Sequence, residues 1–286
     1  MVKFIRKRLF LSLFVFLFLQ RLWAFEVSLS TDTVYPGDTL AVWVTGISSR
    51  SRMSCSLLGR HYPLYPLQNE KMRTLIGIPL GINAQETDLK VRKKIFLFYQ
   101  KRRKRVTIEK KDFSIQILKM PPKKQRLLGR PRNRKEREEI KEVLCRETRE
   151  QYWKGIFGWP VQSRISGSFG LRRRLSDGRP WGRHLGIDIA ADEGTPVYAP
   201  NAGEVLLCRE FTLHGKTVIL DHGQGVMSIF LHLEKFKTRE GARVQKGEVI
   251  GTVGSSGFAS ASHLHWGLYI HGIPVDPLVW TRKKFD

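Results

Sequence analysis

The chain has few cysteines and few acidic residues for its length. Among its 286 residues are three Cys, and 26 Asp+Glu stand against 50 Lys+Arg. Three cysteines exclude a disulfide-stapled miniprotein. None of Cys55, Cys145 and Cys208 has a CxxC partner, which argues against a cysteine metal site and leaves at most one disulfide. The hydrophobic fraction of 41% excludes wholesale disorder, and the length predicts two domains or one large one.

The shortage of acids gives a formal net charge of +24, which is unevenly distributed. Residues 1–150 hold 33 Lys+Arg and 14 Asp+Glu, a net of +19, whereas residues 151–286 hold 17 and 12, a net of +5. Seven of the eight His lie in the second part. A charge of this size invites an anionic partner. The basic half and the half with catalytic potential are therefore different parts of the chain.

The N-terminus has the pattern of an export signal. A basic start precedes the apolar run Leu9–Leu19, and Ala24 offers a small residue for cleavage. Eleven helical residues rise about 16 Å, less than the roughly 30 Å of a hydrocarbon core. We predict a signal peptide over residues 1–24, with an uncleaved membrane anchor extending to Phe25 as the alternative. Both place the mature chain in the periplasm or cell envelope, and the basic flank disfavours a buried N-terminal helix.

Residues 25–118 are expected to form a small β-sandwich-like domain. The strand candidates are Val27–Thr31, Thr39–Val44, Val91–Tyr99 and Val106–Leu118. The run Lys101–Arg105 between the last two predicts a charged hairpin tip. Strands at this spacing without helical periodicity are typical of a sandwich.

Residues 119–156 are expected to be a basic linker followed by a short helix. Nine of the nineteen residues Lys119–Arg137 are Lys or Arg, and prolines interrupt regular structure. The helix is predicted over Arg137–Tyr152, with Ile140, Val143 and Leu144 on one side. In an exported protein the basic segments favour an anionic envelope polymer or a membrane surface over nucleic acid. The alternative is a solvated linker without a partner.

Residues 157–282 are predicted to be an all-β domain rich in short strands. The strand candidates are Thr195–Tyr198, Gly203–Cys208, Thr217–Asp221, Val226–His232, Glu248–Val253 and His263–Ile270. No long amphipathic helix appears among them. His214, His222 and His271 each precede a glycine and are interpreted as turn residues.

Three segments of this domain place histidine or aspartate at strand spacing. His184 and Asp188 are four residues apart, so on a strand they share a face, as do His263 and His265. His232 follows the same pattern, with leucines at alternate positions expected to face the core. Imidazole nitrogen and carboxylate oxygen suit zinc, and catalytic zinc usually has three protein ligands plus water. The spacing predicts His184, Asp188 and one of the paired histidines as ligands and leaves open which.

The two remaining histidines are predicted to act on that water. A zinc-bound water ionises near neutral pH and becomes a nucleophile. Histidines beside it would serve as acid–base groups or oxyanion donors.

The same residues resemble the M23 metallopeptidases, the lysostaphin-like or LytM-type peptidoglycan endopeptidases. The resemblance runs from about Trp159 to Trp280. Its matching segments are Ser166–Gly170, His184–Ala191, Gly194–Ala199, Gly203–Val205, Asp221–Gly223, Phe230–Leu233, Gly247–Gly251, His263–Trp266 and Asp276–Leu278. This chain has Phe230 where many members have Tyr, and Trp181 and Arg183 where some have a Tyr.

The resemblance implies an antiparallel β-sheet groove with one zinc at its floor, held by His184, Asp188 and His265. It implies catalytic roles for His232 and His263. The function expected is an exported zinc endopeptidase acting on the cross-link or stem peptide of peptidoglycan. The alternatives are a non-catalytic or autoinhibited regulator or scaffold of other wall hydrolases, and a module in which the basic half binds an anionic surface.

Overall fold

The structure is a computed structural model that describes residues 25–48, 51–119, 121–127 and 131–286. It contains 49% strand and 7% helix, which confirms the all-β prediction. The predicted signal peptide lies outside the described residues. Within the described ranges, no helix is long and apolar enough to cross a membrane.

The chain forms two compact units that do not follow the predicted boundary after residue 118. The first comprises the residues up to Asp32, Ala41–Thr74 and Glu86–Val106. The second comprises Thr33–Leu40, Leu75–Gln85 and Thr107–Asp286. The second unit therefore includes the predicted linker.

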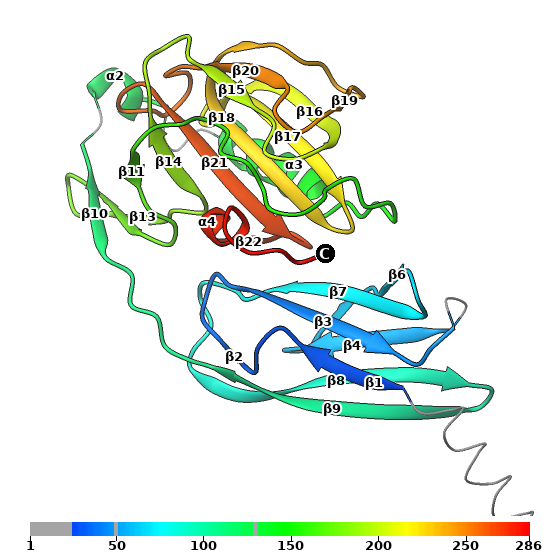
Figure 1. Ribbon diagram of the computed structural model, residues 1–286. Helices are drawn as coiled ribbons and strands as arrows, with labels where there is room; N and C mark the ends of the chain where they lie inside the picture. The colour runs from blue at the N-terminus through cyan, green and yellow to red at the C-terminus, as the bar shows by residue number, and fades with distance from the viewer. Residues whose placement is uncertain (1–24, 49–50, 120, 128–130) are drawn as a thin grey trace, which may run out of the picture. The chain divides into compact units, whose positions relative to one another are not determined.

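The strands before residue 109 form two sheets (Figure 1). They are β1 (Glu26–Leu29), β2 (Thr33–Val34), β3 (Thr39–Thr45), β4 (Met53–Leu57), β5 (Arg60–Tyr62), β6 (Tyr65–Leu67), β7 (Lys71–Gly77), β8 (Gln85–Ile95) and β9 (Phe98–Ile108). The strand orders are β1-β3-β7-β6 and β2-β9-β8-β4-β5. In the first unit, Val42 and Val44 from one sheet and Cys55, Leu89 and Val91 from the other are buried. Two sheets with apolar inner faces are the organisation of the predicted sandwich.

The β8–β9 hairpin turns at Phe96 and Leu97, so the predicted charged tip at Lys101–Arg105 is wrong. Lys101–Arg105 lies inside β9, and the predicted strand Val91–Tyr99 spans the turn. The apolar run Phe96–Tyr99 contains no Gly, Asn or Pro, and it therefore continues the strand pattern through the turn.

The second unit is built on an antiparallel ten-stranded sheet, as predicted for this domain. Its strands are β11 (Ile165–Gly167), β14 (Ile187–Ala190), β15 (Pro196–Tyr198), β16 (Gly203–Phe211), β17 (Gly215–Gly223), β18 (Val226–Phe236), β19 (Arg243–Val244), β20 (Val249–Val253), β21 (His263–Ile270) and β22 (Ile273–Val275). The main order is β11-β14-β21-β18-β17-β16-β19, so β21 and β18 are central. All six predicted strands are present.

A smaller three-stranded sheet lies beside the large one. It contains β10 (Ile115–Leu118), β12 (Arg172–Leu175) and β13 (Pro180–Arg183) in that order. β10 runs parallel to β12, with Ile115 opposite Arg172 and Leu118 opposite Leu175. The end of the predicted N-terminal domain is thus a strand of the second unit.

Helix α3 spans Pro131–Leu144, so the predicted helix over Arg137–Tyr152 begins and ends too late. Proline is favoured in the first turn of a helix, because its missing N–H would have no partner there. Short helices α2 (Pro122–Gln125) and α4 (Pro277–Trp280) complete the described helices.

The predicted apolar side of α3 is confirmed. Ile140, Val143 and Leu144 are buried in one cluster with Ile229 and Leu231 of β18, and with Tyr269 of β21. The helix covers the end of the sheet face on which Tyr269 lies. The other end of the same face carries the histidines.

Candidate active site

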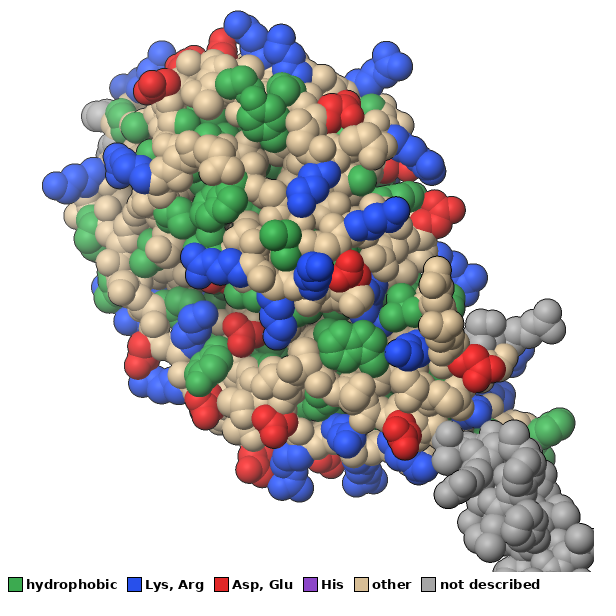
Figure 2. All heavy atoms as spheres, in the orientation of Figure 1, with side chains coloured by type: hydrophobic (Ala, Val, Ile, Leu, Met, Phe, Trp, Pro, Cys, Tyr) green, Lys and Arg blue, Asp and Glu red, His purple; other side chains and the backbone are tan. Residues whose placement is uncertain are grey.

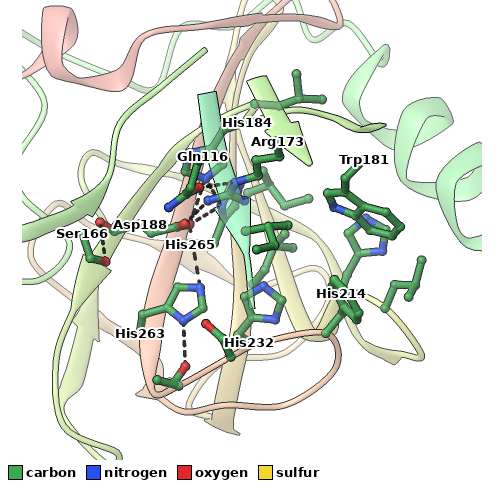
Figure 3. A pocket seen from close by; sticks show the side chains of 18 of the residues that line it. Gln116, Ser166, Arg173, Trp181, His184, Asp188, His214, His232, His263 and His265 are labelled. Carbon is green, nitrogen blue, oxygen red and sulfur yellow. Dashed lines mark hydrogen bonds and ion pairs between the residues drawn. The ribbon is translucent and has the colours of Figure 1, made fainter. Parts of the chain in front are cut away.

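The structure brings His184, Asp188 and His265 together at the floor of a groove (Figure 3). His184 Nε2 lies 2.9 Å from Asp188 Oδ1 and 3.0 Å from His265 Nδ1. His265 Nδ1 lies 2.8 Å from Asp188 Oδ1. All three side chains are buried. The three atoms that could ligate a metal therefore form a nearly equilateral triangle.

These residues meet through sheet pairing and a tight loop. Asp188 and His265 are directly opposite each other in the β14–β21 ladder. His184 lies before β14, so the expectation of one strand through residues 184–188 is wrong although the two side chains converge. A Cβ on Gly186 would strike the Trp266 carbonyl and lie 2.8 Å from His265 Nε2. Glycine at this position lets the loop fold closely against β21.

The donor set fits zinc. Tetrahedral zinc with bonds of about 2.1 Å separates its ligand atoms by about 3.4 Å, within roughly half an ångström of the separations seen here. His184 Nδ1 donates to the Ser168 carbonyl at 2.7 Å, which directs the Nε2 lone pair toward the triangle. Of the paired histidines, His265 completes the triangle, whereas His263 Nε2 lies 3.7 Å from Asp188 Oδ1.

His232 and His263 lie beside the triangle, with ring centroids 5.0 Å apart. His232 Nδ1 contacts the Ser256 carbonyl and His263 Nδ1 the Ala261 carbonyl, each at 2.8 Å. A carbonyl oxygen only accepts, so in both rings Nδ1 donates. Each neutral imidazole therefore carries its lone pair on Nε2, which is the atom left to act as a base.

The backbone at His232 breaks the strand alternation expected from the sequence. In β18, Ile229 and Leu231 line the groove face, and strict alternation would turn the next side chain away. His232 has φ of 64°, a left-handed conformation that is uncommon for a residue other than glycine. With this change of phase, His232 lines the groove together with Leu231, so the expectation that Leu231 faces away from the groove is wrong.

Burial favours the neutral form of His232 and His265, whereas hydrogen bonds keep the Asp188 carboxylate ionised. Burial lowers the pKa of His265 to about 4, against the opposing effect of Asp188. Burial, followed by the neighbouring imidazoles, holds the pKa of His232 well below its usual value. Burial opposes ionisation of Asp188, but hydrogen bonds from His184 and His265 hold its pKa well below the ordinary value. Neutral imidazoles and a carboxylate are the protonation states in which these groups bind a metal.

Two site residues were not predicted individually from the sequence. Arg173 of β12 forms a short ion pair through Nη2 with Asp188 Oδ2. Its Nε donates to Gln116 Oε1 of β10 at 2.8 Å. Arg173 belongs to the run Arg172–Arg174. Only its middle residue contacts the carboxylate.

The groove has a volume of about 540 Å³ and is lined by both apolar and polar side chains, with arginines prominent among the polar ones. Arg137, Arg164, Arg173 and Arg183 line it, while Asp188 is the one acidic lining residue in the described chain. Trp181 stacks against Phe258 at its rim, with ring centroids 4.9 Å apart. The groove is therefore positively charged around a single buried carboxylate.

Residues 113–118 and Lys124 cross from one side of this groove to the other, and we call them the strap. At one side β10 pairs with β12. The Phe113 ring packs so closely on Gly170 there that any side chain at position 170 would collide with it. At the other side Lys124 Nζ donates to the carbonyls of Ser255 and Gly257 at 2.8 and 2.6 Å. Gln116 and Leu118 line the groove between these attachments.

The other histidines of this domain lie outside the triangle. His214 lies in a turn and lines the groove, and His271 lies at a turn with φ of 49°. His222 lies within β17 and not in a turn. Its Nδ1 donates to the Ala202 carbonyl, and its Nε2 contacts Ser228 Oγ, both at 2.8 Å. His222 is a buried, fully bonded core residue.

Comparison with known proteins assigns the groove to a family. Residues 182–277 match the family model described as Peptidase family M23. They belong to that family. The matched region contains the three clustered residues and both neighbouring histidines.

Two curated relatives each match less than half of the chain. A Neisseria meningitidis serogroup B protein named DD-carboxypeptidase/endopeptidase Mpg is 41% identical over 118 residues, 41% of this chain and 27% of that protein. The Vibrio cholerae peptidoglycan DD-endopeptidase ShyA is 36% identical over 122 residues, 42% of this chain and 28% of that protein. The matches thus span about a quarter of these relatives.

A solved structure matches more of the chain than the M23 region. A Pseudomonas aeruginosa protein assigned to the M23 peptidases aligns with a TM-score of 0.65 and 25% identity. The alignment covers 86% of this chain and 94% of that one. The similarity to this solved structure therefore extends beyond the M23 region.

Proposed function

We propose that the chain is an exported, zinc-dependent endopeptidase that hydrolyses peptide bonds of peptidoglycan, in the cross-link or the stem peptide, through a zinc-activated water. The observation that carries the proposal is the triangle of His184, Asp188 and His265 beside His232 and His263. A domain that had become a scaffold would be under no constraint to keep all five groups in working positions. The M23 region and the names of its relatives support peptidoglycan as the substrate.

One zinc per chain would be held by His184 Nε2, Asp188 Oδ1 and His265 Nδ1. When bound, zinc supplies a Lewis acid that polarises the scissile carbonyl and lowers the pKa of the attacking water. In His232 and His263, Nε2 is the ring nitrogen that is not bonded to a backbone carbonyl. Either can accept the proton of the water and later return it to the departing amine. Their Nδ1 hydrogen bonds to backbone carbonyls hold both rings in the required tautomer.

The arginines of the groove support an anionic peptide as substrate. Peptidoglycan peptides carry free carboxylates, and Arg137, Arg164 and Arg183 form no ion pair within the described residues. Their charge attracts such a substrate and orients it over the metal site.

The strap favours a second proposal, that the isolated enzyme is autoinhibited. Gln116 and Leu118 occupy the side of the groove between the β12 attachment and the Lys124 attachment. A cross-linked peptide needs the full length of a groove, so the strap has to be displaced before a large substrate enters. We propose that detachment of Lys124 opens the groove.

Peptide release from purified sacculi tests the catalytic proposal. The zinc-loaded chain is incubated with sacculi of defined chemistry, and the released peptides are identified by mass. We expect the unmodified chain to release peptides whose masses identify the scissile bond. The Asp188→Asn variant should release none. If neither the chain nor its strap variants release peptide from any sacculus type, the catalytic proposal is wrong and the scaffold alternative stands.

A further inference from the structure

The most exposed large apolar side chains of the described residues form one patch at the turn of the β8–β9 hairpin. Phe96, Leu97, Phe98 and Tyr99 are 89, 90, 77 and 55% exposed. Every other exposed large apolar side chain in the described ranges is at most 51% exposed. Single exposed apolar residues are common on proteins, but four consecutive ones mark an interaction site.

The turn itself does not require these residues. Phe96 has φ of 49°, in the left-handed region where two-residue hairpin loops favour Gly, Asn or Asp. A bulky aromatic residue there works against the stability of the hairpin. The fold therefore gives no reason for a phenylalanine at this position.

The outer half of the hairpin contributes nothing to the core. Leu89, Val91 and Val106 are buried, but no side chain from Arg92 to Arg105 is. β8 and β9 are each eleven residues long, and the pairing of β8 with β4 ends at Lys93, just before the turn.

Positively charged residues flank the patch on both strands of the hairpin. Leu89–Lys104 contains eight Lys or Arg and no Asp or Glu. The acids farther from the turn, Glu86 and Asp88, pair with Arg105 and Arg103 at 2.9 and 3.9 Å. Figure 2 shows Lys and Arg scattered over the face drawn, so positive charge alone does not mark a site on this protein. The combination of charge with an apolar tip distinguishes the hairpin.

We propose that the outer half of the β8–β9 hairpin docks on an anionic lipid bilayer. Phe96, Leu97 and Phe98 enter the boundary between headgroups and acyl chains, and Tyr99 lies at the headgroup level. The lysines and arginines of both strands contact the phosphates. This inference concerns the first unit and does not depend on the proposed catalytic function.

Other occupants fit the patch less well. A hydrated anionic polymer would match the charges but offers no apolar phase to Phe96 and Leu97. A second copy of the chain would bring two cationic tips together. The chain also enters the first unit beside this hairpin, because the Arg102 guanidinium lies 5.3 Å over the ring of Phe25.

Amide hydrogen exchange of the full chain with vesicles tests the proposal. Vesicles of phosphatidylcholine with phosphatidylglycerol are compared with vesicles of phosphatidylcholine alone, with a soluble polyanion, and with the chain at raised concentration without lipid. We expect protection of residues 95–99 with the anionic vesicles only, weakened at high salt because the electrostatic part is screened. Protection by the polyanion or by self-association alone would overturn the lipid assignment, as would no protection at all.

Flotation with the same vesicles compares matched variants with the unmodified chain. The Phe96→Ser/Leu97→Ser double variant should lose about tenfold or more in vesicle partitioning, since it removes the groups that enter the apolar phase. Lys94→Gln/Lys101→Gln should weaken partitioning and flatten its salt dependence. Tyr198→Ser, half-exposed in the other unit, and Lys284→Gln are the controls expected to change nothing. If the double Ser variant floats like the unmodified chain while the folded state is intact, the hairpin is not the docking element.

Discussion

Arg173 and Asp188 form an ion pair at the floor of the groove, and their side chains are only 15% and 11% exposed. The arginine uses Nη2 for Asp188 Oδ2, which leaves Oδ1 directed at His184 and His265. Gln116 fixes the guanidinium from the opposite side through Nε. One carboxylate oxygen is thus held by a cation of the chain while the other faces the candidate metal position. The pair makes Arg173 a positioning residue for Asp188.

Substitution of Arg173 is expected to weaken zinc binding. Partners that orient a metal-ligating side chain typically contribute 10–100-fold in metal affinity or activity, and we expect a loss in that range for Arg173→Gln. Zinc affinity is measured by competition with a chromophoric chelator, together with kcat and KM on a peptide substrate. Arg174→Gln, on the exposed phase of the same strand, is the matched control. Tighter zinc binding in Arg173→Gln would mean that the arginine competes with the metal.

Loosening the strap is expected to raise activity on large substrates. Lys124 donates to two carbonyls of the loop that also bonds His232, so Lys124→Gln removes one attachment of the strap. The substitution should raise the rate of hydrolysis several-fold on intact sacculi. It should change the rate little on a short peptide, because a short peptide can enter beside the strap. The neighbouring exposed residue gives the control Lys123→Gln. Equal rates for the two variants on sacculi would show that the strap does not limit entry.

The sequence predicts the members of the site better than the contacts among them. His184, Asp188, His232, His263 and His265 stand out because their residue types and spacing are rare in a structural strand. Arg172, Arg173 and Arg174 are identical in type, and only pairing with β10 and β13 selects the middle one. The contribution of Gln116 likewise depends on a parallel strand pairing between segments more than fifty residues apart.

The remaining errors have local causes. The hairpin turn at Phe96 lacks the residues that normally mark one, so the strand pattern passed through it. His232 lines the groove because of a left-handed backbone that no alternation rule anticipates. The predicted helix begins too late because the basic first half of α3 resembles a linker, although Pro131 is favoured in the first turn of a helix. At Phe96 and His232 a left-handed backbone, and not the side-chain pattern, decided the outcome.

The predicted zinc ligands and the predicted acid–base histidine are expected to differ in their effect on zinc content. His184→Ala and Asp188→Ala should lose zinc and turnover together, because each removes one corner of the triangle. His232→Ala should retain zinc while kcat falls about 10²–10⁴-fold, the usual contribution of a general acid–base group. Metal content by atomic absorption, measured beside sacculus hydrolysis, checks both. Release of zinc by His232→Ala would contradict the assigned division of roles.

The stability of the fold is expected to decrease as the pH falls below the ordinary range of histidine. Burial lowers the pKa of His222 to about 4, and it does the same to His214. Because the unfolded chain binds protons near pH 6.5 and the folded chain does not, stability is complete above about 6.5 and declines toward 4. For His222 alone the loss reaches about 3 kcal/mol at the acid end.

Urea unfolding of the full chain at a series of pH values measures this dependence. His222→Gln removes the titrating group, so it should destabilise the protein at neutral pH yet flatten the decline between about pH 6.5 and 4. His61→Gln, an exposed substitution in the other unit, should leave both unchanged. An identical slope in His222→Gln and the unmodified chain would show that this imidazole is protonated in the folded state. The hydrogen bonds to Ala202 and Ser228 would then bind the cationic ring instead of the neutral one.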